Sequence, residues 1–465
     1  MANESVKKWR VAPSHIVLGP VIAAIVLAAV TLSGMPAPAA WTLAVVVWVA
    51  WWWITEALPL PVTSLLPFIL LPLGGIISFQ ESSRALGDPV IILFMGAFML
   101  AKAVEASGVH RRMALNLVSL VGASDGRRLV LSFMLAAALL SMWISNTAAV
   151  LALLPVALAL AEASEDHRFQ RALLLGLAYS ASLGGVATLI GTPPNLIFAS
   201  IYEQISGESF GFARWMSIGI PMVALGLPVI GLWLTRGLTL NVPLELPKLG
   251  RISVYEKRVL IVFGTVIFLW VFRTEPFGGW TALVGTPLVG DSTVALAGVV
   301  AMFMVSNGRE GRLLTWEQAV DIPWGILLLF AGGICLAAGI MQSGLGDIIG
   351  SALGNFGGMP IWLFVLLLTL SVSFLTEVTS NTATATLLMP ILAATAIAID
   401  LPIEVLMIPA AIACSCAFCL PVATPPNSIV FASQKVTIKE MSREGFVLNI
   451  ALALITTLVV MVFVW

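Results

Sequence analysis

Two stretches decide the fold of this chain: SNTAAVLALLP at residues 145–155 and SNTATATLLMP at residues 380–390. Each lies inside a longer apolar run, residues 129–160 and residues 361–396, and places a hydroxyl, an amide and a second hydroxyl within it. Such a triplet interrupts a membrane helix, and backbone freed at bilayer depth must pack in protein or line a polar cavity. We therefore predict that each run folds back on itself as a re-entrant hairpin of two half-helices.

The composition of the whole chain is that of a membrane protein. Of 465 residues, 59% are hydrophobic and only 10% are charged, whereas ordinary soluble domains carry about 25% charged residues. This composition excludes a soluble domain of this size, and the net charge of -1 gives no bulk attraction to nucleic acid. We predict an all-α polytopic protein of the bacterial inner membrane.

Hydropathy predicts eleven crossings besides the two hairpins, each about 20 residues long. They lie near residues 14–33, 40–57, 61–77, 89–106, 172–201, 214–235, 257–272, 291–306, 323–342, 403–432 and 445–465. With the N-terminus in the cytoplasm, nineteen of the 23 lysines and arginines fall in cytoplasmic segments. Counting either long run as a straight crossing would invert every later loop and spoil this asymmetry. The topology therefore predicts a cytoplasmic N-terminus, a retained first helix and an external C-terminus.

The chain also contains an internal repeat. The SNT segment recurs after 235 positions, and LFMGAFMLAKAVEASGV from Leu93 matches LFAGGICLAAGIMQSGL from Leu329 after 236. GTPPN at residues 191–195 recurs after 232 positions as ATPPN. Each copy holds five crossings, an odd number, so the second copy would enter the membrane upside down. Inverted repeats with broken helices are typical of secondary transporters.

The predicted helix breaks carry neutral oxygen and amide groups. In both TPPN segments two prolines withhold N–H donors and leave upstream carbonyls free. Hydroxyl, amide and carbonyl oxygens suit a hard cation such as sodium, whereas half-helix N-termini favour an anion. Neither triplet and neither break contains Arg, Lys or His. A multivalent anion bound there would need sodium as its countercharge, and this co-binding predicts coupling.

Two acids lie close to the apolar segments, Glu56 and Glu377. Acids within membrane segments are commonly functional. Glu56 precedes a Pro-x-Pro end and can reach the membrane interface. Glu377 lies three residues before Ser380, and the sequence leaves open a direct role in transport or a structural role as a hydrogen-bond acceptor in the hairpin.

The paired motifs, together with WWWITEALPLPVTSLLP at residues 51–67, resemble the divalent anion:sodium symporter family, whose members carry di- and tricarboxylates or sulfate. The resemblance covers nearly the whole chain. It implies a homodimer in which a scaffold domain holds the interface while a transport domain of hairpins and broken helices moves as an elevator. The scaffold would comprise residues 1–123 and 257–357, the transport domain residues 124–235 and 358–465, and a cytoplasmic linker residues 236–256.

The same resemblance implies two sodium sites and one substrate site, with no organic cofactor. The first sodium would bind Ser141, Ser145, Asn146 and the carbonyl of Gly191, and the second Thr376, Thr379, Asn381 and the carbonyl of Ala423. The substrate carboxylates would meet Ser145, Asn146, Thr147, Thr192 and Pro193 on one side, and Ser380, Asn381, Thr382, Thr424 and Pro425 on the other. Ala423 stands where the first copy has Gly191, a modest change if only the carbonyl is used.

The leading hypothesis is a sodium-coupled symporter of C4-dicarboxylates such as succinate, malate and fumarate. A sodium-independent dicarboxylate exchanger and a sodium-coupled citrate or sulfate transporter stay open, because the same neutral donors suit any oxyanion. We do not expect an enzyme, because a hydrolase using Ser145 or Ser380 as nucleophile would need a nearby base. A channel fits two inverted half-sites less well than alternating access does.

Overall fold

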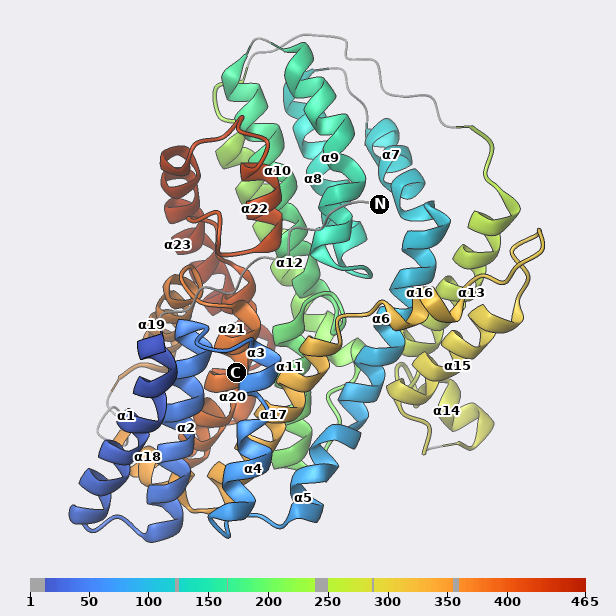
Figure 1. Cartoon of the computed structure of the whole chain (residues 1–465). Coiled ribbons are helices and arrows are strands. Elements are labelled where there is room, and N and C mark those ends of the chain that lie inside the picture. Colours follow the sequence, from blue (N-terminus) through green and yellow to red (C-terminus); the bar gives the residue numbers. More distant parts are fainter. Residues whose placement is uncertain (1–12, 122–124, 165, 239–249, 287, 354–358) are drawn as a thin grey trace.

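The computed structural model describes residues 13–121, 125–164, 166–238, 250–286, 288–353 and 359–465 (Figure 1). These residues form α-helices joined by turns and loops, and among them the pairing of Ser306 with Arg312 is an isolated β-bridge outside any strand. The predicted all-α class is therefore confirmed. Residues 1–12, which the prediction places in the cytoplasm, and residues 239–249 of the predicted linker lie outside the described residues.

The described residues of the first half of the chain form helices α1 to α12. They are α1 (Pro13–Leu32), α2 (Ala37–Thr55), α3 (Leu60–Thr63), α4 (Leu66–Leu73), α5 (Phe79–Arg84), α6 (Pro89–Ser107), α7 (Val109–Val121), α8 (Gly126–Ser141), α9 (Asn146–Ala163), α10 (His167–Gly184), α11 (Pro193–Ser206) and α12 (Phe212–Leu234), with 3₁₀ turns at Ala85–Gly87 and Gly185–Ala187. The second half has α13 (Val254–Val271), α14 (Gly279–Val284), α15 (Asp291–Met304), α16 (Trp316–Val320), α17 (Trp324–Gln342), α18 (Leu345–Leu353), α19 (Ile361–Thr376), α20 (Asn381–Ala398), α21 (Ile403–Ser415), α22 (Pro425–Phe431) and α23 (Ile438–Phe463).

Eight helical segments in the described part of the chain are long and apolar enough to cross a membrane, and four shorter apolar helices accompany them. The predicted crossings at 172–201 and 403–432 are each broken into two helices, α10 with α11 and α21 with α22. The predicted crossing at 61–77 is not one helix, since Ser64 and Leu65 separate α3 from α4. Prolines at positions 61, 67 and 72 remove N–H donors there and favour short helices.

Both SNT triplets interrupt their apolar runs. Helix α8 ends at Ser141 and α9 begins at Asn146, while α19 ends at Thr376 and α20 begins at Asn381. Ser145 and Ser380 are the N-cap residues, whose side chains accept from the backbone N–H groups of Ala148 and Ala383. N-capping by serine satisfies a backbone donor that a helix start otherwise leaves free. The two predicted helix breaks are therefore present at the predicted residues.

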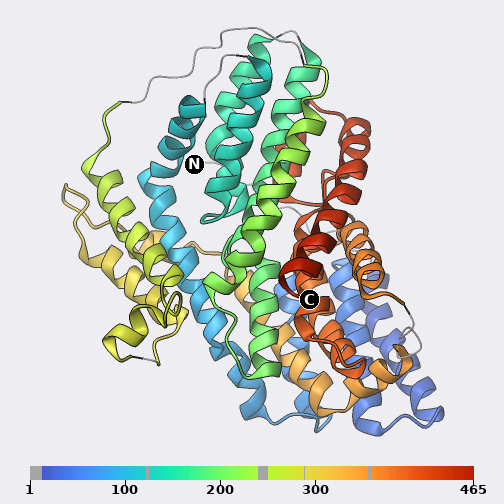
Figure 2. The same cartoon turned by 180° about the vertical axis from the view of Figure 1, so that it is seen from behind.

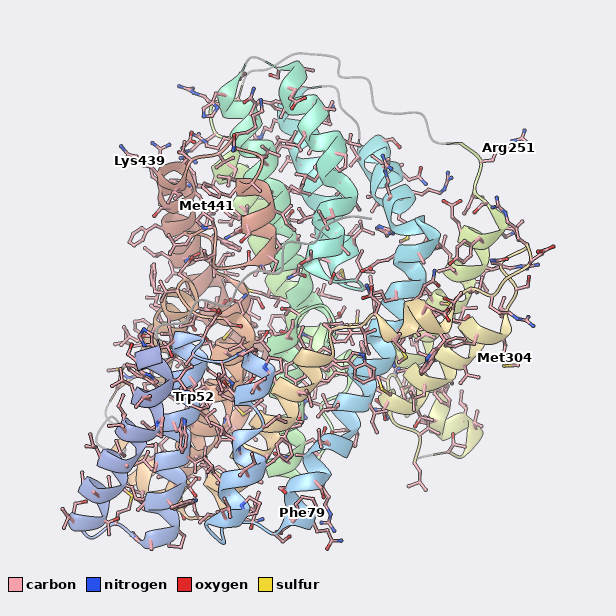
Figure 3. All side chains as sticks on the ribbon, in the orientation of Figure 1. Trp52, Phe79, Arg251, Met304, Lys439 and Met441 are labelled. Atoms are coloured by element: carbon pink, nitrogen blue, oxygen red, sulfur yellow. The ribbon has the colours of Figure 1, made fainter. Side chains whose placement is uncertain are left out.

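Helices from the two halves of the chain pack together. Helices α22 and α23, near the C-terminus, lie beside α10 and α12 of the first half (Figures 1 and 2). Helices α6, α13 and α15 pack together on another side, and α1 packs against α2. Lys439 and Arg251 lie toward one end of the molecule, and Phe79 lies at the opposite end (Figure 3).

Helix α1 shows how sequence and packing agree locally. Pro20 lies inside α1 and has no N–H, so the carbonyl of Ile16, four residues earlier, lacks its helical partner. The indole Nε1 of Trp52 donates to that carbonyl at 3.2 Å. Trp52 and Trp53 are buried, so these tryptophans hold helices together within the chain.

Candidate functional site

The first half-site forms where the start of α9 meets the break between α10 and α11. The Asn146 side chain lies against Ser141 Oγ, the Gly191 carbonyl oxygen at 3.2 Å and the Ala181 carbonyl oxygen at 3.3 Å. With its amide nitrogen turned toward them, Asn146 donates to both carbonyls. With its amide oxygen turned toward them, the Ser141 hydroxyl donates to Asn146 Oδ1, and the amide oxygen faces the two carbonyl oxygens, a repulsion that a cation between them would offset. Oxygen ligands of this kind suit a hard cation.

Two glycines allow this close approach. A Cβ on Gly185 would lie 2.7 Å from Asn146 Oδ1 and 2.9 Å from the Gly191 carbonyl oxygen, closer than ordinary contact. A Cβ on Gly191 would collide with the Gly185 carbonyl. The break in the first half therefore has no space for a side chain at either position.

The second half-site repeats the central contact. Thr376 occupies the position of Ser141 in the repeat, and its Oγ1 donates to Asn381 Oδ1 at 2.6 Å and reaches the Cys414 carbonyl oxygen at 3.4 Å. Ala423 is buried, and its N–H donates to the Leu420 carbonyl at 3.2 Å, as Gly191 donates to Thr188 at 3.4 Å. The two halves thus share their local geometry around Asn146 and Asn381.

One predicted sodium ligand points elsewhere. The Thr379 hydroxyl donates to the Leu375 carbonyl at 2.9 Å and lies 2.6 Å from the Thr384 hydroxyl. Its hydrogen bonds thus lie within the α19–α20 turn, and neither is made with Asn381. A short hydroxyl near a helix end commonly bonds to nearby backbone, which spacing in the sequence does not reveal.

The predicted substrate hydroxyls occupy the N-cap positions of four helices. Ser145 caps α9 and is exposed, and Ser380 caps α20 and is half-buried. Thr192 and Thr424 occupy the N-cap positions of α11 and α22 and are buried; the Thr424 side chain accepts from the Asn427 N–H, whereas the Thr192 side chain makes no capping bond. Pro193 and Pro425 are the first residues of their helices, and Thr147 and Thr382 are half-buried second residues. Helix N-termini carry partial positive charge, which favours an anion. Because α11 and α22 begin with two prolines, their first two residues add no N–H donor.

The halves interlock at these positions. Helix α9 packs against α22, and α20 packs against α11, so each SNT helix contacts the helix that follows the other copy's break. The Thr192 and Ser415 hydroxyls lie 3.2 Å apart across this boundary. Residues of the two repeats are therefore assembled into one unit.

The asparagines of the TPPN segments bridge their own breaks. Asn195 Nδ2 donates to the carbonyls of Gly185 at 3.1 Å, Val186 at 3.4 Å and Thr188 at 2.7 Å. Asn427 Nδ2 donates to the carbonyls of Ala417 and Leu420, both at 3.0 Å. Ala417 and Leu420 lie 232 positions after Gly185 and Thr188, so two of these bonds recur at the spacing of the TPPN repeat.

Glu377 is buried and bonds to the second break. Its carboxylate accepts from the backbone N–H of Cys419 at 2.8 Å and of Leu420 at 3.0 Å, and from Asn449 Nδ2 at 2.7 Å. These contacts favour the structural alternative that the sequence leaves open. Glu56 is exposed and ends α2 in the left-handed conformation with φ 47°.

Two cavities lie away from these residues. One, of about 340 Å³, is lined by residues that include Glu203, Arg273 and Asp291. The other, of about 730 Å³, is lined by residues that include Arg84, Asp88 and Gln204. None of the ten predicted substrate residues lines either cavity.

Sequence reasoning did not single out several residues that complete the half-sites: Ala181, Gly185, Asn195, Cys414, Ser415 and Asn427. The TPPN spacing marked Asn195 and Asn427 only as further amides. Carbonyl ligands carry no sequence signal, because every residue has one.

Comparisons with known proteins agree with this architecture. A family model described as a citrate transporter matches residues 50–407. A sodium-dependent dicarboxylate transporter SdcS of Staphylococcus saprophyticus is 40% identical and covers 96% of this chain and 90% of its own length. The SdcS protein of Staphylococcus aureus strain NCTC 8325 is 39% identical with the same coverage.

A solved structure supports the fold alone. The YdaH transporter of Alcanivorax borkumensis matches with a TM-score of 0.57 at 13% identity, covering 81% of this chain and 86% of that one. The identity to the SdcS proteins, over nearly the full length, carries the assignment. The chain belongs to the divalent anion:sodium symporter family.

Proposed function

We propose that this chain is a sodium-coupled symporter of dicarboxylates. The observation that carries the proposal is the convergence of neutral oxygens on Asn146, with its counterpart at Asn381. The partners of these two side chains are hydroxyls and carbonyls rather than basic groups, so sodium supplies the positive charge that a dicarboxylate needs. The relatives named as sodium-dependent dicarboxylate transporters support the same function.

The sodium ligands follow from the two half-sites. The first sodium binds Ser141, Ser145, Asn146 and the Gly191 carbonyl. The Ala181 carbonyl oxygen, 3.3 Å from the Asn146 amide, is a further oxygen beside this site. The second sodium binds Thr376, Asn381 and the Ala423 carbonyl. Thr379 joins this second set only if its hydroxyl leaves its bonds to Leu375 and Thr384.

The substrate lies between the two SNT helices. Its carboxylates meet the N-terminal residues of α9 and α11 on one side and of α20 and α22 on the other. The four N-caps support this, because helix N-termini stabilise anions. The recurrence of the Asn195 and Asn427 bonds supports a structural repeat, and we propose that this repeat is inverted and contains two re-entrant hairpins.

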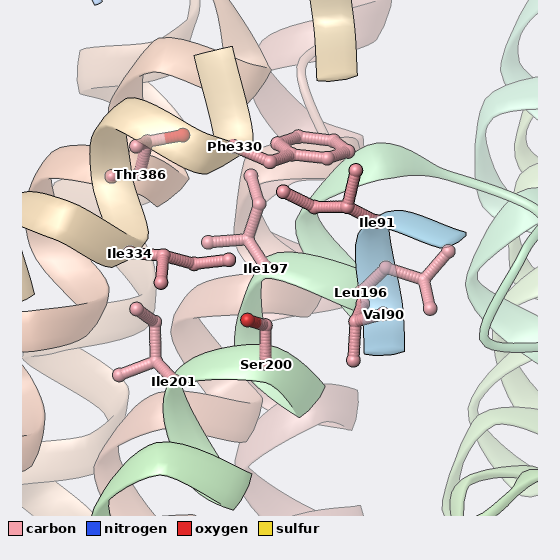
Figure 4. A pocket seen from close by; sticks show the side chains of 10 residues that line it. Val90, Ile91, Leu196, Ile197, Ser200, Ile201, Phe330, Ile334 and Thr386 are labelled. Carbon is pink, nitrogen blue, oxygen red and sulfur yellow. The ribbon is translucent and has the colours of Figure 1, made fainter. Parts of the chain in front are cut away.

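Transport proceeds by an elevator movement of residues 124–235 and 358–465 against a scaffold of 1–123 and 257–357, in a homodimer with a cytoplasmic N-terminus. Helices α6 and α17 of the proposed scaffold contact α11 and α20 of the proposed transport domain, and a small pocket lies between them (Figure 4). It is lined mainly by branched aliphatic side chains, including Val90, Ile197 and Ile334. Apolar contacts are non-directional, so they are exchanged at small cost.

The preferred substrates are C4-dicarboxylates such as succinate, malate and fumarate. Citrate is the second candidate, because the matching family model is described as a citrate transporter. Competition of malate, fumarate, citrate and sulfate against labelled succinate uptake separates them: inhibition by malate and fumarate but not by citrate or sulfate supports the C4 preference.

Uptake into proteoliposomes tests the coupling. An inward sodium gradient should drive succinate accumulation, and Asn146→Ala or Asn381→Ala should abolish it. Succinate counterflow in sodium-free buffer would show a sodium-independent exchanger and overturn the proposal.

A further inference from the structure

We propose that Asn195 and Asn427 are positioning residues that decide which backbone carbonyls face the two sodium ions. The inference rests on the proposed sodium coupling and adds to it two side chains that contact the loops around the ions. Each asparagine is fully buried at the start of the helix that follows a break.

The side-chain amide of Asn195 is hydrogen-bonded to a particular set of backbone carbonyls in the first break. A break between two helices leaves several carbonyls without helical donors, and each is a possible cation ligand. Asn195 Nδ2 takes the carbonyls of Gly185, Val186 and Thr188. The Gly191 carbonyl is outside this set and points at Asn146. The amide therefore withdraws the other carbonyls from coordination and leaves Gly191 to face the ion.

The second half has the same division. Asn427 Nδ2 holds the carbonyls of Ala417 and Leu420 at 3.0 Å each. The carbonyl of Ala423 is outside this pair. Because the chain order and the bonds recur, the same role follows for both asparagines.

The amide oxygens of the same two asparagines differ from the amide nitrogens in their contacts. Within the described part of the chain, Asn195 Oδ1 and Asn427 Oδ1 are buried and have no hydrogen-bond partner. An unsatisfied buried acceptor destabilises a protein. Both positions nevertheless hold asparagine. We infer that the side-chain NH₂ group, which donates to the carbonyls of the break, is the part that each position needs.

The sodium site is sensitive to the position of this loop. The Gly185 carbonyl accepts from Asn195 Nδ2. Gly185 also lies close to Gly191: a Cβ added to Gly185 would be 2.9 Å from the Gly191 oxygen. A shift of Gly185 therefore moves the proposed sodium ligand. Loss of the Asn195 donor should act on sodium affinity before it acts on the substrate contacts.

Asn195→Leu and Asn427→Leu test this, because leucine fills nearly the same space without a donor. The matched control is Asn116→Leu, at an exposed position of α7. The sodium dependence of labelled succinate uptake is measured in proteoliposomes, with the succinate KM determined at saturating sodium. Size-exclusion chromatography in detergent verifies folding. If a leucine variant does not fold, Asn→Ala, a smaller side chain that also lacks the donor, is measured in the same way.

Each leucine variant should raise the half-saturating sodium concentration about tenfold or more, the equivalent of losing buried hydrogen bonds. The succinate KM at saturating sodium and the control should not change. A folded leucine or alanine variant with wild-type sodium half-saturation would overturn the inference, as would a rise in the succinate KM alone. Sodium-independent uptake by the wild-type protein would instead overturn the proposed function.

Discussion

Adding one methyl group at Gly185 is a direct test of the first sodium half-site. In the structure, a Cβ at this position would lie 2.7 Å from Asn146 Oδ1 and 2.9 Å from the Gly191 oxygen, whereas ordinary van der Waals contact begins at 3.4 Å. Gly185→Ala must therefore displace two of the proposed sodium ligands. The second half provides the control, because Ala417 stands at the equivalent position and already carries a Cβ.

The magnitude follows from the cost of overpacking, which is about 1–3 kcal/mol. If this cost falls on the sodium-bound state, the half-saturating sodium concentration rises by about five- to 150-fold, since about 1.4 kcal/mol is a factor of ten. Ala417→Gly removes a methyl group from the second break without a collision, so sodium dependence should change little.

The assay is the sodium dependence of labelled succinate uptake in proteoliposomes, with the melting temperature of the purified protein as a check on folding. Gly185→Ala with wild-type sodium half-saturation would refute the assignment of Asn146 and Gly191 to a sodium site. An equal loss in Ala417→Gly would show that the effect is not specific to the collision.

Three further predictions concern stability and movement. Glu377→Gln replaces an oxygen that accepts from a backbone N–H with a donor, so we expect a loss of about 1–3 kcal/mol in unfolding free energy, measured as a lower melting temperature; an unchanged melting temperature would contradict the structural role. Gly333→Ala would drive a Cβ into the Thr386 methyl group between α17 and α20, so uptake should fall, and adding Thr386→Ser, which removes that methyl group, should restore it; no restoration would show that this contact is not the cause. Arg112 donates to Glu256 at 2.7 Å and holds the pKa of that carboxyl below its usual range, so the stabilisation is present above the ordinary carboxyl pKa and is lost as the pH falls through the lowered one. Arg112→Ala should therefore lower the melting temperature at pH 7, and the difference from wild type should shrink on acidification; a difference that is independent of pH would contradict the ion pair.

The helix breaks could be predicted from sequence because their causes are local. Ser145 and Ser380 are strong N-caps inside apolar runs, and paired prolines cannot continue a helix from residues 192 and 424. The positions of Asn146 and Asn381 at helix starts follow directly.

The contacts between segments could not be predicted in the same way. The approach of Gly185 to Gly191, the Ala181 carbonyl near Asn146 and the link from Thr192 to Ser415 depend on how helices pack. Thr379 is an example of a side chain whose contacts the motif does not reveal. Its position indicates a sodium ligand, but its hydroxyl makes hydrogen bonds with Leu375 and Thr384. Backbone carbonyls and local hydroxyl bonds leave no mark in residue spacing.

Sodium ions accompany the anion because the residues proposed for the site include no Arg, Lys or His. Simultaneous measurement of labelled sodium and labelled succinate entering proteoliposomes tests it most directly. The two half-sites predict that at least two sodium ions enter with each succinate, in a fixed ratio that does not vary with the gradient. Succinate entry without sodium entry would contradict the account.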